Sequence, residues 1–129
     1  MATVTLDRIQ RDGLHLNVGM CFDGLTTTLT VANEMEVKAI VERLPVCCAL
    51  LDQIGWDEHG TKESYRLEVD ANVSALAAGM IRGQQEYVAD LAYTFELSPG
   101  EENRQRMEAA RSVLAGLLTI AEPALEHAA

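Results

Sequence analysis

The sequence predicts an α+β fold, in which an N-terminal antiparallel meander of three to four strands packs against three helices. Two observations support this. Apolar residues alternate with polar ones in the first quarter of the chain, and they recur at three- and four-residue steps in three later stretches. With 129 residues, of which 48% are hydrophobic, the chain is long enough for one core, so residues 1–129 are expected to form a single domain. A mainly helical bundle with a marginal hairpin is the alternative.

Three strands are expected within residues 3–31. The first is short and centred on Val4 and Leu6. In residues 14–22 every second residue is apolar, and in residues 25–31 leucine and valine alternate with threonine, which is β-branched and favours strands. An Asp-Gly pair precedes each of these two runs, and such pairs are typical of hairpin turns because glycine accepts a positive φ.

A Pro-kinked helix is expected next. Asn33 and Glu36 have the spacing of a capping box, and an apolar stripe then continues in phase across Pro45 to about Ile54. Residues 55–64, GWDEHGTKES, are polar and rich in turn formers, so they are expected to form a loop. The alternation in residues 65–69 predicts a short fourth strand.

The stretch from Asp70 to Glu96 is the strongest helix signal in the chain and is expected to organise the rest. Its main apolar stripe comprises Val73, Leu76, Ala77, Met80, Val88, Leu91 and Phe95. Beside it runs a stripe of small residues at four-residue spacing: Ala71, Ala75, Gly79 and Gly83. Because a helical glycine costs about 1 kcal/mol relative to alanine, we expect another backbone to approach this stripe closely.

The last helix is expected to begin with Ser98 as its cap and Pro99 at its first position, and to end at Pro123. Its predicted buried stripe is formed by Met107, Ala110, Leu114, Leu117, Leu118 and Ala121.

The charge balance bears on the partners of the chain. Ten basic and twenty acidic residues give a net charge of −10, which opposes binding to nucleic acids and to anionic membranes and leaves a basic protein as a candidate partner. No apolar run reaches the roughly 18 residues that a membrane helix needs, and the first residues lack the pattern of a secretory signal. The odd set Cys21, Cys47 and Cys48 favours reduced thiols, so a cytoplasmic protein is expected.

The chain carries no motif that specifies catalysis or a cofactor, and none of either is expected. Residues 56–59 contain the only close cluster of metal-ligand residue types, which makes Asp57 and His59 weak metal candidates, although a solvated turn explains them more simply. Cys47 and Cys48 lie on the apolar stripe of their helix, where a free cysteine behaves as a small hydrophobe.

The side of the central helix opposite its main stripe carries few charges for a solvent-facing surface. Either another helix of the same chain covers it, or it binds a partner. On the second interpretation the interface comprises Ala75, Ala78, Gly79, Arg82, Gly83, Ala89 and Tyr93.

These features together favour a non-enzymatic protein-interaction module: an adaptor, an assembly factor or a small acidic chaperone that acts as a homodimer. In size and charge, though in no motif, the chain is similar to small acidic secretion chaperones. One alternative is a small-ligand-binding protein with a pocket between sheet and helices, lined by Met20, Phe22, Tyr65 and Tyr87. A second alternative is an enzyme that uses the loop around His59 or the polar strand face with His15.

Overall fold

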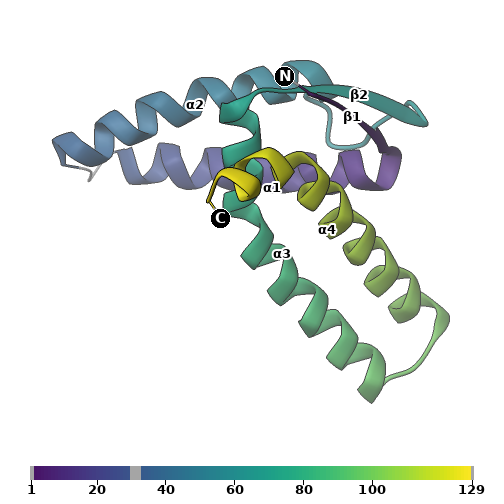
Figure 1. Ribbon diagram of the computed structural model, residues 1–129. Helices are drawn as coiled ribbons and strands as arrows, with labels where there is room; N and C mark the ends of the chain where they lie inside the picture. Colours follow the sequence, from purple (N-terminus) through teal and green to yellow (C-terminus); the bar gives the residue numbers. More distant parts are fainter. Residues whose placement is uncertain (1, 30–32, 129) are drawn as a thin grey trace.

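In the computed structural model, which describes residues 2–29 and 33–128, the chain is mostly helical and carries a small antiparallel sheet (Figure 1). The predicted meander of three or four strands is therefore wrong, and the helical alternative describes the fold better. In chain order the elements are β1 (Ala2–Asp7), α1 (Arg8–Leu29), α2 (Glu34–Ile54), β2 (Ser64–Val69), α3 (Ala71–Leu97) and α4 (Glu101–Ala128).

The main correction concerns α1, where two strands were expected. Leu14 and Val18 are buried and Phe22 packs against the core, and these residues are four apart. Residues four apart lie on the same face of a helix, and they also lie on the same face of a strand, where every second residue does. These three positions therefore cannot distinguish a helix from a strand. The residues between them distinguish the two: Leu16 and Met20 are 61% and 65% exposed, because they lie on the outer side of a helix.

The turn and strand signals inside α1 have other roles. Both Asp-Gly pairs, at residues 12–13 and 23–24, lie within the helix. The threonines fit the helix by bonding back to it: the hydroxyl of Thr26 donates to the carbonyl of Phe22, and that of Thr28 donates to the carbonyl of Gly24. The end of the expected strand, residues 30–31, lies outside the described residues.

The sheet has two strands, which are the first and the fourth of those predicted. β1 pairs antiparallel with β2, in a register that places Val4 opposite Leu67 and Leu6 opposite Tyr65. These side chains are buried, whereas the alternate residues of both strands are exposed, so the helices cover one face of the sheet, as expected.

The predicted starts of α2 and α3 are confirmed. The Asn33 side chain accepts a hydrogen bond from the backbone N–H of Glu36, and the Asp70 side chain accepts one from that of Val73. The helix α2 also continues through Pro45 to Ile54, as the phase of its apolar stripe predicts.

The helix α4 differs from its prediction at both ends. Ser98 caps the C-terminus of α3, and α4 begins only at Glu101. Pro123 lies within α4, which continues to Ala128. A proline perturbs the backbone hydrogen bonds around it, and here the N–H of Ala124 donates to the hydroxyl of Ser74 on α3. This bond explains why a serine is fully buried between the two helices. Leu118, expected in the buried stripe of α4, is 40% exposed.

Figure 1 shows two helical hairpins, α1–α2 and α3–α4, which diverge from a junction beside the sheet. The core lies at this junction, where one face of the sheet meets all four helices. Its largest fully buried apolar side chains are Leu6, Leu14, Leu50, Ile54, Leu67, Leu117 and Ile120.

Among the helical glycines of the described chain, Gly13 lies closest to another helix. A Cβ built on Gly13 would lie 2.2–2.9 Å from the side-chain carbons of Val113 on α4, closer than real Cβ atoms lie to their neighbours. The backbone expected to approach Gly79 and Gly83 is not found within the described chain, since apart from the adjoining backbone of α3 no described atom lies within 4 Å of a Cβ built on either.

Substitution tests the contact at Gly13. Gly13→Ala is expected to lower the free energy of unfolding by about 1 kcal/mol or more, because overpacking against Val113 exceeds the helix-propensity gain of alanine. Gly19→Ala in the same helix is the control. No described atom lies within 4 Å of a Cβ at Gly19, so its stability should rise by up to about 1 kcal/mol. Urea unfolding measures both, and equal effects of the two substitutions would contradict the close contact.

Candidate functional site

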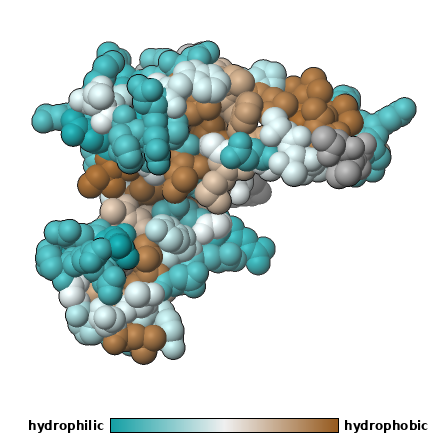
Figure 2. Space-filling model, turned by 180° about the vertical axis from the view of Figure 1, so that it is seen from behind, coloured by the Kyte–Doolittle hydropathy of each residue, from teal (hydrophilic) through white to brown (hydrophobic). Residues whose placement is uncertain are grey.

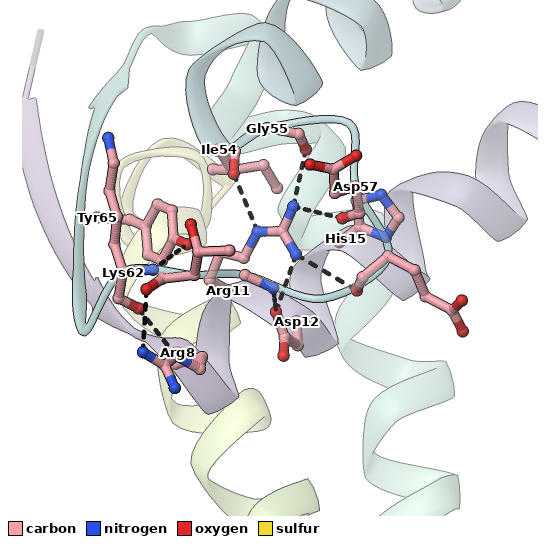
Figure 3. Close-up of polar contacts among 12 residues, drawn as sticks. Arg8, Arg11, Asp12, His15, Ile54, Gly55, Asp57, Lys62 and Tyr65 are labelled. Atoms are coloured by element: carbon pink, nitrogen blue, oxygen red, sulfur yellow. Dashed lines mark hydrogen bonds and ion pairs between the residues drawn. The ribbon is translucent and has the colours of Figure 1, made fainter.

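The polar loop between α2 and β2 is built around the side chain of Arg11, which is only 1% exposed (Figure 3). The guanidinium lies among carbonyl groups from the end of α2 and from the loop. Its Nε donates to Ile54, its Nη2 donates to Gly55 and Asp57, and its Nη1 donates to Glu58, at distances of 2.6–3.3 Å.

The remaining bond of Arg11 runs from Nη1 to the carboxylate of Asp12, at 2.8 Å. With this bond the guanidinium makes five hydrogen bonds, as many as it has N–H groups. A guanidinium used in this way has no donor left for a substrate anion. Arg11 therefore holds the loop in place. The centroid of the Tyr65 ring lies 5.7 Å from the Cζ of Arg11, so the ring covers the guanidinium on one side.

Asp12 ties the middle of the loop to α1. One of its carboxylate oxygens also accepts the backbone N–H of Gly60, at 2.8 Å. Burial would raise the pKa of Asp12, but the hydrogen bonds from Arg11 and Gly60 and the positive charges of Arg11 and His59 outweigh it and hold the pKa below 3.8.

Three further contacts fasten the loop. The hydroxyl of Tyr65 accepts the N–H of Lys62, at 2.9 Å, and the side chain of Arg8 donates to the carbonyls of Thr61 and Lys62. The imidazole of His15, expected on a strand face, projects from α1 instead and lies 2.8 Å from the carbonyl of Trp56. Side chains of α1 thus form hydrogen bonds with both ends of the loop.

The two metal candidates, Asp57 and His59, lie in this loop with exposed side chains, around a polar hollow of about 220 Å³. The carbonyl of Asp57 is already used by Arg11. Within the described part of the chain, no three histidine, cysteine, aspartate or glutamate side chains are grouped so that they could hold a metal ion.

The predicted interface residues of α3 fall into two regions. Ala75 and Gly79 line a groove of about 400 Å³ between α2 and α3. Ala89 and Tyr93 line a more open hollow farther along α3, towards the α3–α4 turn. Of the others, Arg82 and Gly83 are exposed, and Ala78 is partly buried and packs against the core.

The groove between α2 and α3 combines small, apolar and charged side chains. Cys21 of α1 also lines it. The full set that lines it is Cys21, Glu42, Arg43, Val46, Asn72, Ala75, Leu76, Gly79 and Met80. Figure 2 shows hydrophobic side chains gathered over the α1–α2 hairpin and around its junction with the α3–α4 hairpin. Met20 and Val41, which adjoin groove residues in the sequence, are both more than half exposed.

The four residues proposed for a pocket between sheet and helices are dispersed. Tyr65 lies at the loop hollow, Phe22 packs against the core, and Met20 and Tyr87 are 65% and 52% exposed. The loop hollow contains one of these residues and the groove contains none.

Some functional residues were not predicted from the sequence: Arg11 as the centre of the loop, and Glu42, Arg43 and Asn72 as residues of the groove. The signal for Arg11 was present: it lies three and seven residues before Leu14 and Val18, on the buried side of a helix. That signal is visible only once residues 8–29 are assigned to a helix. Nothing in the sequence places α2 beside the start of α3.

Comparisons with protein-family models, with curated proteins and with solved structures give no significant match. Among the described helices, none is both long and apolar enough to cross a membrane.

Arg11→Lys tests the role assigned to Arg11. An ammonium has three donors for five acceptors, so buried oxygen atoms would lose their partners. The free energy of unfolding, measured in urea, is expected to fall by about 3 kcal/mol or more. Arg8→Lys is the matched control, because Arg8 bonds the same loop from an exposed position, and its loss should stay below about 1 kcal/mol. Similar losses for the two variants would contradict a special role of Arg11.

The pKa of Asp12 predicts a pH dependence. A carboxyl whose pKa is lowered by folding stabilises the folded state fully above its unfolded pKa, near 3.8, and this stabilisation is lost as the pH falls through the folded value. Wild type should therefore exceed Asp12→Asn in melting temperature near pH 6, and the gap should shrink towards about pH 3. A gap that stays constant over this range would show that the charge of Asp12 does not stabilise the loop.

Proposed function

We propose that this chain is a non-enzymatic protein-interaction module, an adaptor, assembly factor or small acidic chaperone, which acts as a homodimer. In the proposed dimer, the groove between α2 and α3 and the exposed side of α3 contact the same surface of a second copy. Closed two-fold dimers are the commonest soluble oligomers, and their interfaces are self-complementary.

The observation that carries this proposal is the open glycine stripe of α3. All four of its residues, Ala71, Ala75, Gly79 and Gly83, are exposed, and no described atom would touch a Cβ at either glycine. Two glycines in the middle of a helix cost about 2 kcal/mol, and no packing within the described chain offsets this. A second molecule that packs against the stripe would supply the missing contact, as Val113 supplies it at Gly13.

The charges favour a second copy as the occupant. The chain has a net charge of −10, so two copies repel over most of their surface. The groove, in contrast, contains one carboxylate and one guanidinium, Glu42 and Arg43, and the nearby side of α3 adds the ion pair of Arg82 with Glu86. A charge-balanced surface lets two acidic copies approach, and a two-fold axis can set each cation against the partner's anion. The acidic surface outside the dimer would remain available to a basic protein.

Light scattering across protein and salt concentrations tests the dimer. Wild type is expected to dimerise, and more strongly as salt screens the repulsion, with a screening length of about 8 Å at physiological ionic strength. The double variant Ala75→Glu with Gly79→Glu should be monomeric, because it places two carboxylates in the contact. Ala115→Glu, at an exposed alanine of α4 outside the groove, is the control and should dimerise like wild type.

Gly79→Leu separates assembly from folding. Its side chain would enter open space, so the free energy of unfolding of the monomer should be unchanged or rise by up to about 1 kcal/mol through helix propensity. The same side chain would block close approach of a second copy and shift the protein to monomer. A wild type that is monomeric at every salt concentration would disprove the dimer. A dimer that survives both sets of groove substitutions would place the interface elsewhere.

A further inference from the structure

The small sheet presents an open edge along β1. In an antiparallel pair, facing residues alternate between those that bond across the pair and those whose N–H and C=O groups point outward. Both backbone groups of Glu68 bond to the side-chain amide of Gln53 on α2, so Glu68 belongs to the outward set. Thr3 lies opposite Glu68, and Thr5 follows two residues later, so the backbone groups of both threonines point away from β2.

The start of α1 agrees with this alternation. Asp7 lies two residues beyond Thr5, and its N–H donates to the side-chain oxygen of Gln10, at 3.1 Å, rather than to β2. The carboxylate of Asp7 in turn accepts the N–H of Gln10, at 2.8 Å, which caps α1 and ends the edge. Thr3 and Thr5 have no such contact. Within residues 2–29 and 33–128, no group bonds to their outward N–H or C=O groups.

The two edges of the sheet differ in how they are protected. At Glu68 the amide of Gln53 occupies the outer edge of β2, as a neighbouring strand would. The edge of β1 lacks the features that usually protect an exposed strand, since it has no proline, no lysine and no bulge. Both of its threonines are exposed. An extended chain can therefore reach the free backbone groups of β1.

We propose that β1 binds a short extended segment of a basic partner protein, which pairs with it as a third, antiparallel strand. The segment bonds to the N–H and C=O groups of both Thr3 and Thr5, and these backbone bonds supply the affinity. The antiparallel orientation continues the pairing of β1 with β2 and places each bond directly across the two strands.

The pleat of β1 determines where the segment carries apolar residues. Side chains of an added strand alternate between the two faces in register with those of β1. Those beside Val4 and Leu6 point towards the helices, where these two residues are buried, so they are apolar. Those beside Thr3 and Thr5 lie on the exposed face and are polar.

The charges of the exposed face favour basic residues at both ends of the segment. Near one end, the hydroxyl of Thr3 donates to the carboxylate of Glu68, at 3.2 Å, and at the other end lies the carboxylate of Asp7. Between them Thr5 lies opposite Arg66, which disfavours a cation. The matching pattern is basic, apolar, threonine, apolar, basic. The net charge of −10 attracts such a segment and repels a second copy of the chain.

This inference goes beyond the proposed dimer and does not depend on it. No residue of β1 lines the groove between α2 and α3, so a monomer and a dimer can both bind the segment. The double variant Ala75→Glu with Gly79→Glu should therefore bind it as wild type does. A loss of binding in that variant would place the segment in the groove and overturn the assignment to β1.

The experiment titrates the full chain with the synthetic peptide acetyl-Lys-Val-Thr-Val-Lys-amide and follows amide hydrogen exchange by NMR. The amides of Thr3 and Thr5 are expected to exchange more slowly as the peptide is added, because each gains a bond. Replacement of both lysines of the peptide by glutamate should weaken binding by about tenfold or more.

Two methylated peptides provide the matched controls. N-methylation of the central threonine removes the N–H that faces Thr5 and should weaken binding by about tenfold or more. N-methylation of a valine, whose N–H points away from β1, should leave the affinity unchanged. In the protein, Thr5→Pro should abolish binding and keep the fold, because it removes an outward N–H and no bond to β2.

Three results would overturn the proposal. The first is unchanged exchange of Thr3 and Thr5 at millimolar peptide. The second is an equal effect of the two methylations. The third is protection of these amides that rises with protein concentration in the absence of peptide, which would assign the edge to a second copy of the chain.

Discussion

The burial of one cation, Arg11, is the constraint on which the arrangement of this chain depends. A helix ends with carbonyl groups that have no partner within it, and α2 ends at Ile54, which is buried. The guanidinium of Arg11 meets the carbonyls of Ile54 and Gly55 and so satisfies this end of the helix. Its positive charge also interacts favourably with the negative, C-terminal end of the helix dipole. The chain can then reverse direction through the loop and return as β2, which pairs with β1.

The same interaction explains why Arg11 tolerates burial. A charge inside a protein costs several kcal/mol unless it is fully paired, and here four carbonyls and the carboxylate of Asp12 surround it. Each of the four carbonyls belongs to a different residue of the loop or of the end of α2. The loop therefore has an irregular backbone that is nevertheless held in one position. Its exposed side chains, including those of Asp57 and His59, extend from this ordered backbone.

Sequence patterns predicted both strands and the helices α2 and α3 well, but they missed both ends of α4 and predicted strands where residues 8–29 form a helix. The caps at Asn33 and Asp70, the continuous helix through Pro45 and both observed strands follow from local rules that tertiary structure did not override. Residues 14–22 satisfy the periods of both a strand and a helix, and only their neighbours in space distinguish the two. For the candidate site, the sequence marked the small-residue stripe of α3 but not what lies across from it, because the position of α2 depends on long-range packing. It also drew attention to the loop for its carboxylates and imidazole, although the residue that orders the loop lies 43 positions away from Ile54, its first partner.

The pairing of the two strands has a consequence for the making of this protein. Thr3 of β1 bonds to Glu68 of β2, 65 residues later, and Gln10 of α1 reaches the carbonyl of Ser112, 102 residues later. β1 and the start of α1 therefore leave the ribosome well before these partners do. Chains dominated by such distant contacts fold more slowly than those held by local ones. Until α4 has emerged, the part of α1 that packs against α4 stays uncovered. The chain is therefore most prone to aggregation during its synthesis.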